Sequence, residues 1–296
     1  MSTPKPLLAA TDLSAHARHA ADRAARLARQ RGAELTLLHV PPAHALADLR
    51  EWLGKGMEQQ MQQQAQQQLQ KLADDLQSAH GGTVHARLVR GNVLDEVARA
   101  ADELDVALLV LGARGAGVLR HLVLGSTAER LLRRTTRPVL IVRTEAQQRY
   151  RRALLAIDFS PFSAEVLAQA QQTAPGARWL LVHAFRVPYE EKLRFAGVDA
   201  AVIDSYRLQA RAQATQQLHA LAKAGGLSAG SWDACILEGD PSLRLVEQEQ
   251  ALGGDLVVLG KHGHSAVEDL LLGSVTKHVL AEGKADVLVV TLPGEG

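Results

Sequence analysis

Two glycine-rich stretches of the chain have the residue types and the spacing of an anion-binding site. Residues 110–129 read VLGARGAGVLRHLVLGSTAE, and residues 258–277 read VLGKHGHSAVEDLLLGSVTK. Both follow the pattern G-x2-G-x9-G-S, and in both an apolar run stops at the first glycine. Glycines let backbone amides approach an anion closely, and a helix that begins at Gly-Ser directs free N–H groups toward phosphate. The two stretches therefore predict two sites for the phosphates of a nucleotide.

An aspartate after the first apolar run of each half would bind the other end of the ligand. Asp12 follows residues 6–10, and Asp158 follows residues 153–157. In an open parallel sheet the carboxyl ends of the strands share one edge, so each aspartate is expected near its glycine stretch, accepting hydrogen bonds from a base or ribose. A glycine after a strand and a serine at a helix start also occur without any ligand. The repetition favours binding, although a duplication explains part of the agreement.

Two well-known nucleotide motifs are absent. The sequence holds no GxxxxGK[ST] P-loop, and GARGAG does not fit the GxGxxG dinucleotide fingerprint. The predicted sites must therefore work through the glycine stretches and the aspartates alone.

The elements that position these residues are strands and helices in alternation, which indicates a parallel sheet. In the first half we expect strands at 6–10, 35–40, 84–89, 106–111 and 138–143, and helices at 15–31, 57–76, 94–103 and 126–134. The glutamine-rich stretch within 57–76 would suit a disordered tract, but its apolar residues recur at helical spacing. The second half repeats the pattern, with strands at 153–157, 179–185, 256–259 and 287–290. The prediction is an α/β protein of two tandem doubly wound domains, residues 1–145 and 150–293.

Composition narrows the classes of function. A net charge of +1 and 3% aromatic residues give no reason to expect nucleic-acid binding, and no apolar run is long enough to span a membrane. Cys235 is the only cysteine, which excludes an intrachain disulfide and a cysteine-based metal site. We expect a soluble, cytoplasmic protein with no catalytic residue and no metal ligand.

Together, the G-x2-G-x9-G-S pattern, the aspartate after the first strand and the closing PVLIV and DVLVV strands resemble the universal stress protein family in its tandem form. The resemblance covers residues 5–144 and 151–292. It implies five-stranded parallel sheets flanked by helices, of the adenine nucleotide alpha hydrolase-like kind. Fifth strands pair across a dimer interface in that family, so the two halves could form a pseudo-dimer within one chain, and two chains could form a homodimer.

In the ATP-binding branch of the family these elements hold ATP, alone or with Mg²⁺. Carried over by position, the resemblance implies two sets of nucleotide-binding residues. In the first half they are Asp12, Val40 through its backbone, Gly112, Arg114, Gly115, Gly125, Ser126 and Thr127. In the second half they are Asp158, Ala184, Gly260, His262, Gly263, Gly273, Ser274, Val275 and Thr276.

The two sets differ, so one copy could be empty. Ala128 stands where the second half has Thr276, and His262 replaces Arg114. The resemblance implies an ATP-binding stress or signalling protein whose conformation or partner choice depends on the nucleotide. Two alternatives stay open: a slow ATPase or autophosphorylating enzyme, and an interaction scaffold with vestigial sites. Asp12 and Asp158 are assigned to the adenosine end, far from the γ-phosphate, which leaves no convincing general base.

Overall fold

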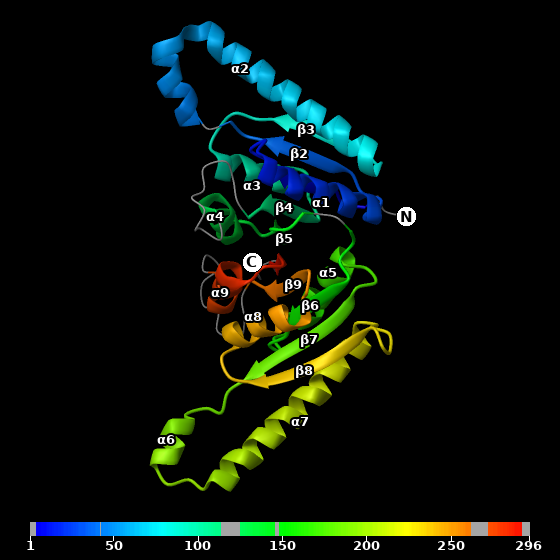
Figure 1. Ribbon diagram of the computed structural model, residues 1–296, viewed down its shortest axis with the longest axis vertical. Helices are drawn as coiled ribbons and strands as arrows, with labels where there is room; N and C mark the ends of the chain where they lie inside the picture. Colours follow the sequence, from blue (N-terminus) through cyan, green and yellow to red (C-terminus); the bar gives the residue numbers. More distant parts are fainter. Residues whose placement is uncertain (1–3, 42, 114–124, 146–147, 262–271, 292–296) are drawn as a thin grey trace. The chain divides into compact units, whose positions relative to one another are not determined.

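Strands and helices alternate through the computed structural model, which describes residues 4–41, 43–113, 125–145, 148–261 and 272–291. Figure 1 shows the elements in sequence order. In the first half they are β1 (Leu7–Ala10), α1 (Ala15–Arg31), β2 (Leu35–His39), α2 (Ala43–His80), β3 (Val84–Leu88), α3 (Val93–Glu103), β4 (Leu108–Gly112), α4 (Ser126–Arg134) and β5 (Val139–Val142). In the second half they are β6 (Arg152–Ala156), α5 (Ser163–Thr173), β7 (Arg178–Phe185), α6 (Glu190–Phe195), α7 (Ala200–Ala224), β8 (Trp232–Glu238), α8 (Pro241–Leu252), β9 (Leu256–Gly260), α9 (Ser274–Glu282) and β10 (Asp286–Val290).

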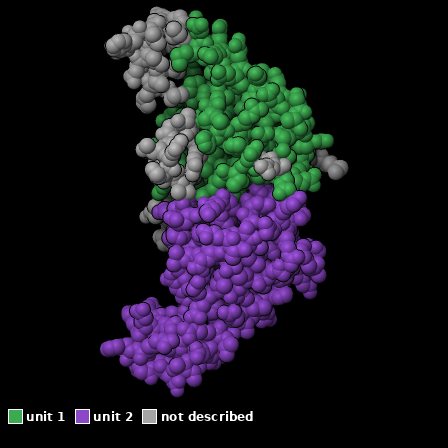
Figure 2. All heavy atoms as spheres, viewed as in Figure 1, with its two compact units in different colours: residues 1–149, 268–272, 286–296 green, residues 150–267, 273–285 purple. Residues whose placement is uncertain are grey.

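The chain forms two compact units (Figure 2), and β10 belongs to the first of them. In that unit the parallel strands run in the order β3-β2-β1-β4-β5, and β10 pairs antiparallel with β5, with Leu288 opposite Leu140. In the second unit the parallel strands run β9-β6-β7-β8. The predicted α/β class is therefore confirmed. The repeat alone did not show that β10 completes the sheet of the first unit.

The strand order reverses beside the central strand of each unit. From β1 the chain moves first to β2 on one side and later to β4 on the other, and β6 has the same relation to β7 and β9. Ligands of doubly wound sheets bind beyond the carboxyl ends of the strands at such a switch point. The segments after β1 and β4, and after β6 and β9, are therefore the places to look for a site.

The core consists of aliphatic strands covered on both faces. Leu7, Leu8, Leu35 and Leu109 are fully buried, as expected for parallel strands with helices packed on both sides. Helix α1 packs against β1 and β4, and its alanines permit a close approach to the sheet. Each fully buried leucine stabilises the fold by about 1.5–3 kcal/mol, so the strand ends rest on a rigid base.

The glutamine-rich stretch is helical, and the alternative of a disordered tract is wrong. Helix α2 is 38 residues long, and Leu69, Leu72 and Leu76 are buried along one side of it. Met61, earlier in the helix, is 36% exposed, so the predicted apolar stripe is covered only toward its C-terminal end. The α2 helix packs mainly against β3 at the edge of the sheet.

A buried carboxylate joins β10 to the end of β5. Asp286 is fully buried, and its Oδ1 accepts hydrogen bonds from the backbone N–H of Arg143 at 2.8 Å and of Thr144 at 3.1 Å. The hydroxyl of Thr144 donates to the same oxygen at 3.1 Å. The other oxygen, Oδ2, lies 3.4 Å from Nε of Arg23, whose side chain is 6% exposed. Three hydrogen bonds and one cation therefore compensate the buried charge.

Candidate functional site

The segments that follow β1 and β6 have the same unusual backbone. Leu13 and Phe159, each the residue after a predicted aspartate, have φ angles of 64° and 58°. Bulky residues rarely adopt this left-handed conformation, which costs on the order of 1–3 kcal/mol and is found where the surroundings enforce it. Asp12 Oδ1 accepts from the N–H of Ser14 at 3.0 Å, and Asp158 Oδ1 accepts from the N–H of Ser160 at 2.9 Å. The two turns are thus built alike.

A histidine on the neighbouring strand fixes each turn. Nδ1 of His39 lies 2.7 Å from the carbonyl oxygen of Thr11, and Nδ1 of His183 lies 2.8 Å from that of Ile157. A carbonyl only accepts hydrogen bonds, so Nδ1 must carry the proton in both rings. The ring of Phe159 also packs on His183, with ring centroids 4.4 Å apart. The two histidines occupy equivalent positions in the two halves, in LTLLHV and in WLLVHAF, and neither was among the predicted site residues.

The helices that follow the glycine stretches begin at open N-termini. Gly125 is the N-cap of α4 and Gly273 is the N-cap of α9, and neither cap has a side-chain hydrogen bond. Ser126 and Glu129 have the spacing of a capping box, but no such box forms, because Ser126 is already inside the helix. Without a capping side chain, the first N–H groups of each helix are available to an anion.

One side-chain contact distinguishes the two helix starts. The Thr276 hydroxyl donates to the carbonyl oxygen of Gly260 at 3.3 Å, which joins α9 to the end of β9. The corresponding residue in the first unit is Ala128, which is buried and has no such group. The second site therefore has a hydrogen bond from a side chain between the helix start and the strand end, and Ala128 cannot form one in the first site.

In the second unit the predicted residues meet around one cavity of about 380 Å³. Asp158 and Ala184 line it from the ends of β6 and β7. The residues contributed by the end of β9 and the start of α9 are Gly260, Gly273, Ser274, Val275 and Thr276. The volume falls in the range of about 300–1,000 Å³ that is typical of small-molecule pockets. His262 and Gly263 lie outside the described residues.

The lining of the cavity includes both apolar and polar side chains. Ile157, Val182, Leu245 and Leu259 supply aliphatic surface near the ends of the central strands. Lys261 was not among the predicted residues, but it lines the cavity next to α9 and is only 7% exposed. The signal for it was present, because Lys261 takes the place of Ala113 in the repeat.

In the first unit the predicted residues lie at the matching positions. Asp12 follows β1, Val40 follows β2 and is buried, and Gly112 ends β4. Because β1 pairs with both β2 and β4, these three residues lie along one edge of the sheet. Gly125, Ser126 and Thr127 form the start of α4. Arg114 and Gly115 lie outside the described residues.

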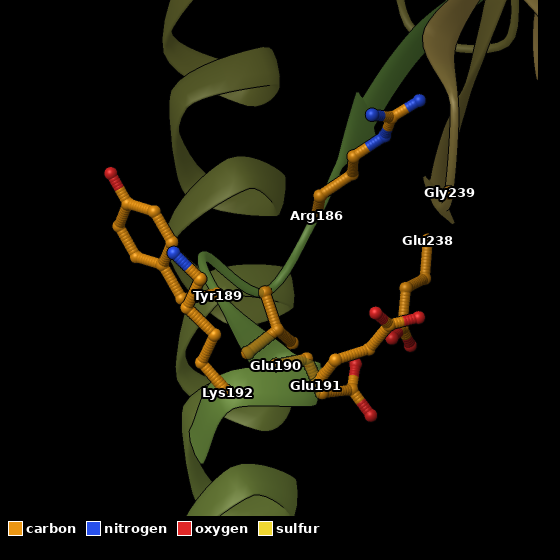
Figure 3. A pocket seen from close by; sticks show the side chains of 8 residues that line it. Arg186, Tyr189, Glu190, Glu191, Lys192, Glu238 and Gly239 are labelled. Atoms are coloured by element: carbon orange, nitrogen blue, oxygen red, sulfur yellow. The ribbon is translucent and has the colours of Figure 1, made fainter. Parts of the chain in front are cut away.

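A second, more open cavity of about 570 Å³ lies beside α6 in the second unit. Figure 3 shows Glu190, Glu191 and Glu238 on one side of it and Tyr189 with Lys192 on the other. Nε of Arg194 donates to Glu190 at 2.9 Å and Nη2 of Arg207 at 2.7 Å, and these hydrogen bonds hold the pKa of Glu190 below its usual value.

Within the described part of the chain, no three or more His, Cys, Asp and Glu side chains cluster in a way that could hold a metal ion. None of the helices described is both long enough and apolar enough to cross a membrane.

Comparison with known proteins places the chain in a family. The sequence model of the universal stress protein family matches residues 4–143 and again residues 149–291. A universal stress protein of Mycolicibacterium smegmatis is 27% identical over 303 residues, which cover 98% of both chains. One of Thermus aquaticus is 32% identical over 143 residues, covering 48% of this chain and 98% of the relative.

Solved structures agree in fold along the whole chain. The crystal structure of a universal stress protein from Archaeoglobus fulgidus matches with a TM-score of 0.66 at 18% identity, covering 98% of this chain and 97% of the other. A functionally unknown protein from Pseudomonas aeruginosa matches with a TM-score of 0.67 at 18% identity, covering 97% and 92%. The two matches to the family model span nearly all of the sequence, and this chain therefore belongs to the universal stress protein family.

Proposed function

We propose that this chain binds ATP in the cavity of the second unit and that the bound nucleotide changes its conformation or its choice of partner. The observation that carries the proposal is the convergence of both predicted ends of the site on one cavity. Asp158 and Ala184 come from the ends of β6 and β7, and Ser274 and Thr276 come from the start of α9.

The chemistry of the lining supports a nucleotide. The aliphatic surface formed by Ile157, Val182 and Leu259 suits the face of a base, and the Asp158 carboxylate can accept hydrogen bonds from ribose hydroxyls. At the other end, the N–H groups of α9 and the hydroxyl of Ser274 can donate to phosphate oxygens. A bound Mg²⁺ would take most of its ligands from phosphates and water, as is usual for this ion.

Binding without rapid hydrolysis fits the site best. Oδ1 of Asp158 already accepts hydrogen bonds from the N–H of Ser160 and from the hydroxyl of Ser163, at 2.9 and 3.3 Å. This carboxylate therefore serves the turn after β6, and in the proposed pose it faces the adenosine end. Release of labelled phosphate from ATP by the purified chain would instead support the slow ATPase.

A matched pair of variants tests the binding proposal. A Cβ at Gly273 would lie 3.3 Å from the carbonyl oxygen of Lys261, so a valine there forces the start of α9 or the end of β9 to shift. We expect Gly273→Val to abolish ATP binding to the second unit, and Gly125→Val to act only on the first. Equilibrium dialysis with labelled ATP gives the stoichiometry of each variant. ATP binding by both variants that equals wild type would refute the site.

The antiparallel pairing of β10 with β5 supports a further part of the proposal, that the two halves act together as a pseudo-dimer. Loss of the pairing should then change nucleotide binding in both halves. The variant Leu288→Pro places a proline ring in the middle of this pairing, opposite Leu140. Dialysis of this variant against ATP measures whether the halves are coupled.

A further inference from the structure

A buried lysine stands at the phosphate end of the proposed site. Lys261 directly follows β9, lines the cavity and is 7% exposed. A lysine in this position adds a positively charged residue to the lining of the cavity. The equivalent residue of the first unit is Ala113, which is 5% exposed and carries no charge. Lys261 and Ala113 are therefore buried to a similar extent, but only Lys261 adds a charge to its site.

The backbone shows which end of the cavity Lys261 belongs to. Its carbonyl oxygen accepts the N–H of Gly273 at 3.4 Å, and Gly273 is the N-cap of α9. Lys261 thus lies against the helix N-terminus, on the side of the cavity formed by Ser274 and Thr276. Asp158 follows β6, which pairs directly with β9, and Ala184 lies near the end of β7, one strand further along the sheet.

A second charge difference has the same sign. The fourth residue of α9 is Lys277, whereas the fourth residue of α4 is Glu129, which pairs with Arg133 at 2.7 Å. At the described positions around the helix start, the first unit has one acid and the second has two lysines. Since each further phosphate adds negative charge, such a site gains more from a triphosphate than from a monophosphate.

We propose that Lys261 makes the second site select nucleotides by their number of phosphates, holding ATP in preference to AMP. This inference rests on the proposed function, because it assigns a determinant of selectivity to the same cavity. The first site has Ala113 in place of this lysine.

Binding of a ligand series tests this role. The experiment uses the Gly125→Val variant as the parent, because we expect it to lose nucleotide binding at the first site. Calorimetry would give the dissociation constants for ATP, ADP, AMP and adenosine. The comparison is between Lys261, Lys261→Met and Lys261→Arg. We expect Lys261→Met to weaken ATP about tenfold or more, AMP less and adenosine not at all, and Lys261→Arg to keep most of the preference.

The possible results distinguish a failure of the inference about Lys261 from a failure of the proposed ATP binding. Equal weakening of ATP and adenosine would mean that Lys261 only supports the fold of the site, and an unchanged ratio of ATP to AMP affinity would mean that it does not select. Either result overturns this inference alone. Absence of any nucleotide binding by the parent overturns the proposed function as well.

A second measurement needs no substitution of Lys261. Added KCl should weaken ATP binding by the parent more steeply than AMP binding, because the phosphate charges are what the site attracts. Parallel salt dependence of the two ligands would contradict the inference even if Lys261→Met failed to fold. The thermal midpoint of the unliganded variants shows whether they fold.

Discussion

The two copies of the candidate site keep the same backbone frame and differ in the side chains near the predicted phosphates. The left-handed residues Leu13 and Phe159 follow the two aspartates, and His39 and His183 fix the two turns in the same way. In contrast, the charged and hydroxyl groups at the helix starts are unlike in the two units. After a duplication, the frame is held by its packing, whereas contacts that serve only a ligand can diverge.

The connection after the second strand also differs between the halves. In the first unit it is the continuous helix α2, of 38 residues, whereas the second unit has the short α6 followed by α7, of 25 residues. No residue of α6 is buried. Arg207 in α7 pairs with Glu190 in α6 at 2.7 Å and with Glu238 at the end of β8 at 2.8 Å. Ion pairs therefore hold α6 in place, without help from apolar burial.

We expect the largest loss of stability from substitution of Asp286, a buried charged residue with no charged counterpart in the first half. Asp286 begins β10, whereas the corresponding residue before β5 is Pro138. Asp286→Ala would leave Arg23 without its carboxylate, and we expect a loss of about 3–5 kcal/mol in the free energy of unfolding of the first unit. Denaturant unfolding measures it. The control is Asp255→Ala, because Asp255 also accepts two backbone N–H groups but lies in an exposed setting. Equal losses would show that burial is not the cause.

A reciprocal exchange tests the single hydroxyl that separates the helix starts. Thr276→Ala removes the hydrogen bond to the Gly260 carbonyl, and we expect a loss of about 1 kcal/mol in stability together with several-fold weaker ATP binding. Ala128→Thr introduces a hydroxyl at the matching place and should not weaken ATP binding by the first unit. Calorimetry of both variants measures the difference. A stronger effect of the change at Ala128 would reverse our ranking of the sites.

Glycine substitutions at Leu13 and Phe159 distinguish the effect of backbone strain on stability from the effect of side-chain packing. Leu13→Gly relieves a left-handed backbone, and we expect a stabilisation of up to about 1 kcal/mol, since the entropy of glycine offsets part of the gain. Phe159→Gly relieves the same strain but loses the packing on His183, which is worth about 0.5–1.5 kcal/mol. Thermal unfolding should therefore rank Leu13→Gly above Phe159→Gly. The opposite order would mean that the turns are not equivalent.

The smallest effect concerns α6 and its dependence on pH. Since the folded pKa of Glu190 is lowered, its stabilisation is present above the usual carboxylate pKa and is lost as the pH falls through the lowered value. Arg207→Ala should increase amide exchange across residues 190–195 at neutral pH, as acid does in the wild type, with little effect on global stability. Hydrogen exchange resolved by segment measures both. Unchanged exchange in α6 would contradict the view that ion pairs hold it.

Much of the fold could be predicted because its signals are local. The alternation of apolar runs with helical spacing gave the order of the elements, and Ser126–Arg134 agrees with α4 residue for residue. The placement of β10 beside β5 could not be read from the repeat, because pairing between distant strands depends on the register of contacts across the chain. The expectation that the fifth strands of the two halves pair came from the family resemblance and not from the repeat.

The positions of the candidate-site residues could be predicted where they depend on glycines and strand ends. They could not be predicted where they depend on contacts between residues that are far apart in the sequence. Asp158, Gly260 and Ser274 lie around one cavity, as their positions after strands and before a helix predicted. Lys261 was overlooked because the pattern gives weight to the residues that the two halves share. The role of His183 depends on a hydrogen bond to the turn beside it, which only the pairing of β6 with β7 brings within reach.

The membership of β10 in the first unit has a consequence for synthesis of the protein. The ribosome makes 143 residues after Val142 before it reaches Asp286. At about 5–20 residues per second, this delay is roughly 7 to 29 s. During that time β5 has no antiparallel neighbour from its own chain, and an unpaired edge strand invites pairing with another nascent copy. The N-terminal unit, although made first, completes its sheet last.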